Sequence, residues 1–316
     1  NTKMRRMSLE LVPEKCEAVL LHTNRATPSL RLKLDGIDIE TKPSIKYLGV
    51  WIDKNTRMTT HIQRTVEKAE KLSKSLSIIM PNVSGPRQKK RRLLASVVTS
   101  TVLYAAPTWN NALKHAKYKN ILDRSMRRAL LRVCSAYRTT PTAGAEAIAG
   151  IAPAHLLVEE RTLVYNTNDR VEAKEWLERK WQEEWEDPEA TTARWTRRLI
   201  PDIRGWSNRR HGETNYYLTQ FLTGHGIFGN YLLRFGLIES DECWYCREPD
   251  DPEHTIYRCD RWEAIRNRAY QEVGETLTPE NTISKMLESE AHWNTIAGFI
   301  TQVMKKKEET ERSMGR

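Results

Sequence analysis

The chain has 316 residues, 39% of them hydrophobic, which is enough apolar material for two domains, and no run is apolar enough to predict a membrane span or a membrane partner. The net charge of +10 is uneven: residues 1–140 hold 28 lysines and arginines against 10 acidic residues, and the remainder holds 23 against 31. So basic a first part favours a polyanionic partner over a protein merely kept soluble by its charge, because each neutralised phosphate releases counterions.

Five cysteines argue against a disulfide framework. Two are isolated, whereas three lie with a histidine near the C-terminus, which is typical of one metal site in a reducing compartment. The sequence starts at Asn1 without an initiator methionine or a secretion signal. We therefore expect a piece of a longer protein that works in a reducing compartment, the nucleus or the cytoplasm.

The first part of the chain has a strand-like pattern. Apolar runs alternate with turn residues at positions 18–21, 30–34, 37–39 and 45–52. The Asp35-Gly36 pair between two of these runs is a strong hairpin signal. The pattern predicts a small antiparallel sheet.

Three amphipathic helices with basic outer faces are predicted next. The first has its apolar face at Ile62, Val66, Ala69, Leu72, Leu76 and Ile79, opposite Arg64, Lys68, Lys71 and Lys74. The second opens with the cations Arg87, Lys89, Lys90, Arg91 and Arg92. The third runs from about 118 to 136 and presents Arg124, Arg128 and Arg132 outward. Asp123 is the only acidic residue between positions 87 and 138, so this segment is a candidate surface for a nucleic-acid backbone.

The composition changes near residues 139–153, which are rich in Thr, Ala, Gly and Pro and predict a subdomain boundary. Residues 155–186 are predicted as a helix whose tryptophans, Trp176, Trp181 and Trp185, form a packing face, because their acidic neighbours disfavour base stacking. Residues 224–229 spell G-x-G-x-x-G outside any β-α-β unit, which predicts a turn between helices. Residues 305–316 form a charged tail that we expect to fray.

The most specific signal is the spacing Cys243-x2-Cys246-x7-His254-x4-Cys259, which predicts a closed tetrahedral zinc site. With four protein ligands the zinc would be structural, because no position is left for water. Trp244 and Tyr245 between the first two ligands could stack on unpaired bases, with Arg247, Arg258 and Arg261 nearby for phosphates. Acidic neighbours weaken that interpretation, so whether the knuckle binds nucleic acid or only holds the segment together stays open.

Several stretches resemble the reverse-transcriptase reading frame of insect non-LTR retrotransposons, particularly the type-1 elements that insert in ribosomal RNA genes. They are residues 9–17 (LELVPEKCE), 46–50 (KYLGV), 103–109 (LYAAPTW), 136–139 (AYRT), 218–226 (LTQFLTGHG) and the cysteine knuckle. The resemblance covers essentially the full length. It implies the C-terminal part of an RNA-directed DNA polymerase, with the element RNA, the target DNA and the upstream palm and fingers of the same polyprotein as partners.

The resemblance also implies roles for particular residues. Lys15 matches the family's lysine near the incoming nucleotide, while Cys16 stands where the family usually has threonine. The primer grip corresponds to Lys46, Tyr47, Leu48 and Gly49, and the basic helices correspond to the thumb that holds the template-primer duplex. The family's catalytic aspartates, with their Mg²⁺, and its endonuclease belong upstream of Asn1. Asp250-Asp251 is flanked by prolines inside the zinc loop and is no substitute for them, so we expect this chain alone not to polymerise.

We therefore predict an α+β protein that is mostly α-helical. The expected segments are the end of the palm at 1–57, a basic helical thumb at 58–140, a helical linker region at 141–235, a CCHC zinc knuckle at 236–265, and a C-terminal helix with its charged tail at 266–316. The alternative function is a domesticated, non-catalytic nucleic-acid-binding protein. A decayed element is a third interpretation, which the uninterrupted frame and the complete ligand set disfavour.

Overall fold

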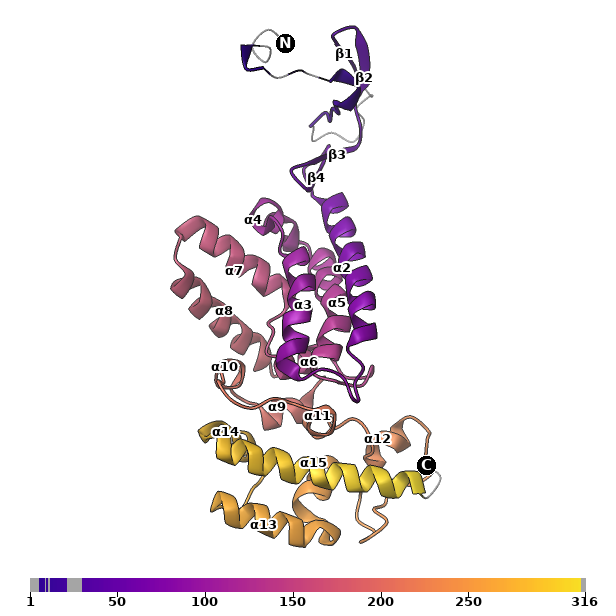
Figure 1. The fold of residues 1–316 in the computed structure, drawn as a ribbon, viewed down its shortest axis with the longest axis vertical. Helices are drawn as coiled ribbons and strands as arrows, with labels where there is room; N and C mark the ends of the chain where they lie inside the picture. Colours follow the sequence, from indigo (N-terminus) through magenta and orange to yellow (C-terminus); the bar gives the residue numbers. More distant parts are fainter. Residues whose placement is uncertain (1–5, 9, 11, 22–29, 314–316) are drawn as a thin grey trace.

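The computed structural model describes residues 6–8, 10, 12–21 and 30–313. Leu9 and Leu11 of the first family motif lie outside the described residues, as do 314–316 of the charged tail. The described part is mostly helical with two small antiparallel sheets, and it is elongated, with the hairpins at one end and the C-terminal helices at the other (Figure 1). Among the described residues, no helix has the length and apolar character to cross a membrane.

The predicted hairpin is confirmed. Strand β1 (Arg31–Leu34) pairs antiparallel with β2 (Ile37–Glu40), with Leu34 opposite Ile37. Asp35 and Gly36 form the turn with φ values of +47° and +87°. This is the left-handed geometry that matches the twist of a tight hairpin.

The apolar run at 45–52 is a second hairpin, so its prediction as one strand was wrong. Strand β3 (Ser44–Tyr47) pairs antiparallel with β4 (Val50–Asp53). Leu48 and Gly49 turn the chain with φ values of +46° and +88°. The apolar Leu48 concealed the turn. The expected strand at 18–21 was also wrong, because it provides only an isolated bridge from Ala18 to Thr41.

The three predicted basic helices are confirmed as α2 (Thr59–Ile79), α3 (Gln88–Val102) and α5 (Ala116–Val133). They pack on one another in the middle of the molecule (Figure 1), and the short helices α4 (Ala106–Trp109) and η2 (Asn110–Lys114) connect the last two. The predicted apolar face of α2 is buried or half-buried, with one exception. Ile79, at the end of α2, is 53% exposed.

The segment with the compositional change at 139–153 contains helix α6 (Thr142–Ala149), whose second half is completely buried. It packs against α5 and against α10 (Ile203–Ser207). The abundant alanines therefore reflect close packing of helices. The subdomain boundary expected here stays a prediction.

The helix predicted over 155–186 is two helices, α7 (Ala154–Thr167) and α8 (Arg170–Trp185). Asn168 is left-handed at φ 56°, and the Asp169 carboxylate accepts hydrogen bonds from the first amides of α8. The break therefore consists of a helix end followed by an N-cap. The packing interpretation of the tryptophans is confirmed for Trp181 and Trp185, which are 5% and 4% exposed.

A buried histidine joins three of these helices. His155 at the start of α7 contacts Asp123 of α5 through Nδ1 and Glu184 of α8 through Nε2, both at 2.9 Å. Burial lowers the pKa of His155, but the two carboxylates outweigh burial and raise it to about 9. The imidazolium thus ties the basic bundle to the α7–α8 hairpin.

The remaining helices cross below the bundle (Figure 1). The predicted turn at 224–229 is confirmed, because it separates α11 (Tyr216–Thr223) from α12 (Gly229–Arg234). The other elements of this region are α9 (Arg194–Leu199), η3 (His254–Arg258), η4 (Asp260–Trp262), α13 (Glu263–Val273), α14 (Thr282–Glu288) and α15 (Glu290–Ser313). A single apolar core runs through the described residues from Ile62 to Met304.

Candidate metal centre and nucleic-acid surface

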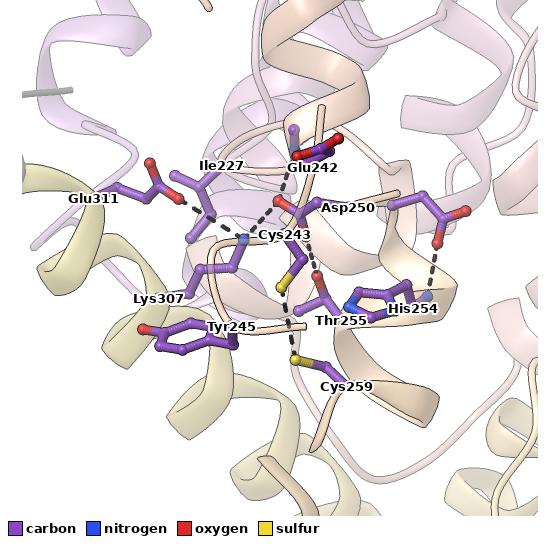
Figure 2. A network of polar contacts seen from close by, with 12 residues as sticks. Ile227, Glu242, Cys243, Tyr245, Asp250, His254, Thr255, Cys259, Lys307 and Glu311 are labelled. Carbon is purple, nitrogen blue, oxygen red and sulfur yellow. Dashed lines mark hydrogen bonds and ion pairs between the residues drawn. The ribbon is translucent and has the colours of Figure 1, made fainter. Parts of the chain in front are cut away.

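The four residues predicted as zinc ligands come together. Their ligand atoms all lie within 4.8 Å of one another, with Cys243 Sγ 3.8 Å from Cys259 Sγ and Cys246 Sγ 3.2 Å from His254 Nε2. Two of them face each other in Figure 2, where Cys243 comes from the knuckle loop and Cys259 from the end of η3. Three soft thiols and one imidazole at this separation form a donor set that suits Zn²⁺.

The backbone around the cysteines is arranged for thiolates. Main-chain amides of Tyr245 and Cys246 are directed at the sulfur of Cys243, and the Arg261 amide at that of Cys259. The pKa of Cys243 is lowered, first because Cys259 donates a hydrogen bond to it, while the pKa of Cys259 is raised by the same contact. A divalent cation bound between these two sulfurs would favour the thiolate form of both cysteines.

The knuckle loop is held in shape by its own main chain. Arg247 takes the left-handed conformation at φ 66°, so the Cys243 amide reaches the Glu248 carbonyl at 2.8 Å and the Arg247 amide reaches the Cys243 carbonyl at 2.9 Å. His254 begins η3, where its amide donates to the Asp251 carboxylate at 2.6 Å. Asp251 is therefore a cap for the turn that carries a ligand.

Asp250 anchors the same loop from within. The residue is 4% exposed, and its carboxylate accepts hydrogen bonds from the Gly229 amide at 2.8 Å and the Thr255 hydroxyl at 2.7 Å. The ammonium of Lys307 lies 2.6 Å from the same carboxylate, and Glu311 lies 3.9 Å from Lys307 (Figure 2). Asp250 and Asp251 therefore both have structural roles: Asp250 anchors the loop from within, and Asp251 caps the turn that begins at His254.

The expectation that 305–316 frays was wrong for the residues described. Helix α15 continues to Ser313, and Lys307, Glu308 and Glu311 are 4%, 9% and 6% exposed. The charges concealed a regular helical face, because positions 296, 300, 303, 304, 307 and 311 follow one another at helical spacing. Two signals could have revealed the Lys307–Asp250 pair. Asp250 lies in a short segment flanked by prolines, and Lys307 lies on the buried face of a helix.

The two knuckle aromatics are in different surroundings. Trp244 is 41% exposed. Tyr245 is 38% exposed, but its hydroxyl contacts Thr310 of α15 at 3.3 Å and its ring lies edge-on to Trp262, with Arg261 over both rings. The tyrosine therefore helps dock the knuckle against α15.

The basic cluster at the start of α3 divides into two kinds of residue. Arg87, Lys89 and Lys90 are exposed. Arg91 is 3% exposed, and its guanidinium donates to the carbonyls of Pro86, Pro81, Met80 and Arg132 at 2.5 to 3.1 Å. Arg92 is half-buried and donates to the Gly150 carbonyl at 3.0 Å. Arg91 and Arg92 hold the α2–α3 loop and α6 in place, and only the first three cations are presented outward.

The other predicted backbone contacts are placed as follows. On α5, Arg124 and Arg128 are exposed, whereas Arg132 is half-buried and donates to the Asn82 side chain at 3.0 Å. On α2 the cations Arg64, Lys68, Lys71 and Lys74 form an exposed stripe opposite the buried face. Lys15 is exposed at the end of η1 (Pro13–Lys15), before the hairpins.

The residues predicted as primer grip form the tip of the second hairpin. Lys46 and Tyr47 end β3, and the turn residues Leu48 and Gly49 follow; Tyr47 is 61% and Leu48 is 76% exposed. Tyr104, from the 103–109 motif, donates its hydroxyl to the Leu48 carbonyl at 2.8 Å. A Cβ on Gly49 would lie 2.9 Å from the Tyr104 ring, so the close approach requires glycine.

The structure therefore defines a mostly helical protein with exposed basic helix faces and a Cys3His cluster that could hold a metal ion, and comparison with known proteins shows which proteins it resembles. The chain is 24% identical over 293 residues to the retrovirus-related Pol polyprotein from type-1 retrotransposable element R1 2 of Nasonia vitripennis, covering 85% of this chain and 71% of that protein. It is 25% identical over 279 residues to the R1 4 counterpart of the same wasp, covering 81% and 70%. With the R1 polyprotein of Bradysia coprophila it is 22% identical over 260 residues, covering 75% of this chain and 26% of that protein.

The chain is thus a homologue of the Pol polyproteins of insect type-1 retrotransposable elements, as the sequence motifs indicated. No family model matches it, and no solved structure matches it.

Proposed function

We propose that this chain is the template-primer-holding part of a retrotransposon RNA-directed DNA polymerase. It supplies a primer-grip hairpin, a basic thumb and a zinc-stabilised knuckle, and it acts in the nucleus next to the upstream palm and fingers. The homology to Pol polyproteins supports the retrotransposon context. The observation that carries the binding role is the bundle of α2, α3 and α5, whose exposed cations lie outside an apolar interior.

The start of α3 is the strongest backbone contact in this proposal. Arg87 precedes the helix without a side-chain cap, so the first amides of α3 and the helix dipole are available to a phosphate together with three exposed cations. Contacts of this kind hold a duplex without reading its sequence. The β3–β4 tip and the exposed side chains of Tyr104 and Val97 extend this surface toward the hairpins.

The four-ligand centre is proposed to hold one structural Zn²⁺ through Cys243, Cys246, His254 and Cys259. The chemistry that the ion supplies is cross-linking of a loop that lacks a core of its own. The chain itself holds the loop in place, because Asp250 contacts the start of α12 and Lys307 of α15.

The thumb is tested by the salt dependence of duplex binding. Replacing Arg87, Lys89 and Lys90 by alanine should flatten the slope of log affinity against log salt by about two to three units, at roughly 0.9 per phosphate contact. The matched control replaces three cations of α8, the exposed Lys174 and Arg179 and the half-buried Lys180, and should keep the wild-type slope. A wild-type slope in the α3 variant would reject this surface and direct the search to Arg124 and Arg128.

A further inference from the structure

A cleft next to the metal loop has no role in duplex holding. Its volume is about 470 Å³, within the range of small-molecule sites, and it lies between α9, the 224–229 turn, α12 and the knuckle loop. Its walls include Arg194, Trp195, His225, Tyr231, Arg234 and Pro252. The 224–229 segment, which the sequence predicted only as a turn, therefore contributes Gly224 and His225 to the wall of this cleft.

The turn is built to form this wall. Gly224 has φ +67°, and a Cβ there would lie 3.3 Å from Trp195 and 3.4 Å from Pro252. The glycine thus lets the backbone pass closely between an aromatic ring and the knuckle loop. Trp195 is fixed behind it, because its Nε1 donates to the Phe221 carbonyl at 2.6 Å.

His225 is held in one orientation by a second family motif. Its Nδ1 lies 3.0 Å from the Thr139 hydroxyl, which in turn lies 2.8 Å from the Tyr231 hydroxyl, and the imidazole lies over the Tyr231 ring at 4.9 Å. Burial, aided by the charge of Arg234, lowers the pKa of His225 to about 4. The ring is therefore neutral at pH 7, and among the described residues its Nε2 has no hydrogen-bond partner.

The electrostatics of the cleft favour an anion. Its two acidic side chains are already engaged, Asp251 by the His254 amide at 2.6 Å and Glu253 by the guanidinium of Arg198. Arg194 and Arg234 are exposed and form no ion pair within the described part of the chain. Two unpaired guanidinium groups beside aromatic rings are the elements with which proteins bind an unpaired nucleotide.

We infer that this cleft binds one unpaired nucleotide of a single-stranded nucleic acid. Its phosphate lies at Arg194 and Arg234, and its base lies against Trp195 and Tyr231 within reach of His225. The inference rests on the proposed nucleic-acid function and adds to it a single-strand site distinct from the duplex surface on α3.

The test measures binding of fluorescent pentanucleotides, rU5 and dT5, to the full chain by anisotropy. Replacing Arg194 and Arg234 by alanine should weaken binding about tenfold or more, the loss expected for hydrogen bonds to a charged group. The control replaces Arg161 and Arg179, which lie on α7 and α8 and are 62% and 60% exposed, and should leave affinity unchanged. His225→Phe keeps the ring but not its nitrogens and should weaken binding by roughly two- to tenfold.

A second measurement locates the strand directly. A pentanucleotide carrying 4-thiouridine should cross-link on irradiation to peptides that contain Trp195 or Tyr231. Wild-type affinity in the double arginine variant, or cross-links confined to other peptides, would overturn the inference. Loss with rU5 alone assigns an RNA site, and equal loss with dT5 assigns a site for either strand.

The two proposals fail separately. Duplex binding with normal salt dependence but no pentanucleotide binding would retain the thumb and reject the cleft. Pentanucleotide binding that depends on Arg194 and Arg234, without duplex binding at α3, would do the reverse.

Discussion

Replacing Lys307 by methionine removes a buried cation while keeping most of the apolar length of the side chain. Both partners of the Lys307–Asp250 pair have side chains that are 5% exposed, so the variant leaves a carboxylate in the interior without its opposite charge. Breaking a buried ion pair on one side costs about 3 to 5 kcal/mol. We expect a value near the lower limit, about 3 kcal/mol, because the Gly229 amide and the Thr255 hydroxyl still donate to Asp250.

The measurement is equilibrium unfolding in urea, followed by tryptophan fluorescence. Lys306→Met is the matched control, because that lysine is exposed on the same turn and should change the free energy of unfolding by less than about 0.5 kcal/mol. Asp250→Asn combined with Lys307→Met should recover part of the loss, with a coupling of about 1 kcal/mol or more. Equal stability of Lys307→Met and Lys306→Met would refute the reasoning and would show that the C-terminal end of α15 is a solvated tail.

Three other outcomes are expected. Cys246→Ser should reduce the zinc content measured by mass spectrometry from about one ion per chain to nearly none and expose the amides of 240–262 to hydrogen exchange, whereas Cys16→Ser should keep the metal. The pKa of His155 is about 9 in the folded chain and 6.5 ordinarily, so the charged imidazolium stabilises the fold fully below about pH 6.5, and this stabilisation is lost as pH rises through 9. Between pH 6.5 and 9 the free energy of unfolding of the wild type should therefore fall by about 3 kcal/mol more than that of His155→Gln. Gly212→Ala should cost about 2 to 4 kcal/mol, because its Cβ would lie 2.1 Å from the Trp293 ring at φ +79°, while Gly236→Ala, at φ +64° with nothing within 4 Å, should cost only about 1 kcal/mol in thermal unfolding.

Local patterns were sufficient for the features set by neighbouring residues. Helical spacing predicted α2 and α5, helix-start signals predicted α3, the Asp35-Gly36 pair predicted its hairpin, and the ligand spacing predicted the four residues that lie together as candidate metal ligands. Each of these depends on interactions within a few residues, or on a chemical requirement visible in the residue types themselves.

The misinterpreted features depend on partners far away in the sequence. Arg91 belongs to a run of cations and looks solvated, but the carbonyl of Arg132, 41 residues later, helps bury its guanidinium. Lys307 belongs to a charged tail, but an acid 57 residues earlier makes it a core residue. A charge run therefore predicts solvent exposure only where no distant group offers matching hydrogen bonds, and composition cannot show whether such a group exists.

The loop with the four candidate metal ligands and the bundle of α2, α3 and α5 are joined through the segments around the 136–139 and 218–226 motifs. The Tyr137 hydroxyl, beyond the end of α5, lies 2.6 Å from that of Tyr216 at the start of α11, and the turn after α11 packs on Pro252 of the knuckle loop. Asp250 then connects this loop to α12 and α15. Since each step is a buried or half-buried contact, loss of the metal should loosen more than the knuckle. The cleft walls at the 224–229 turn would be affected next, so a metal-free chain should lose single-strand binding before it loses duplex binding on α3.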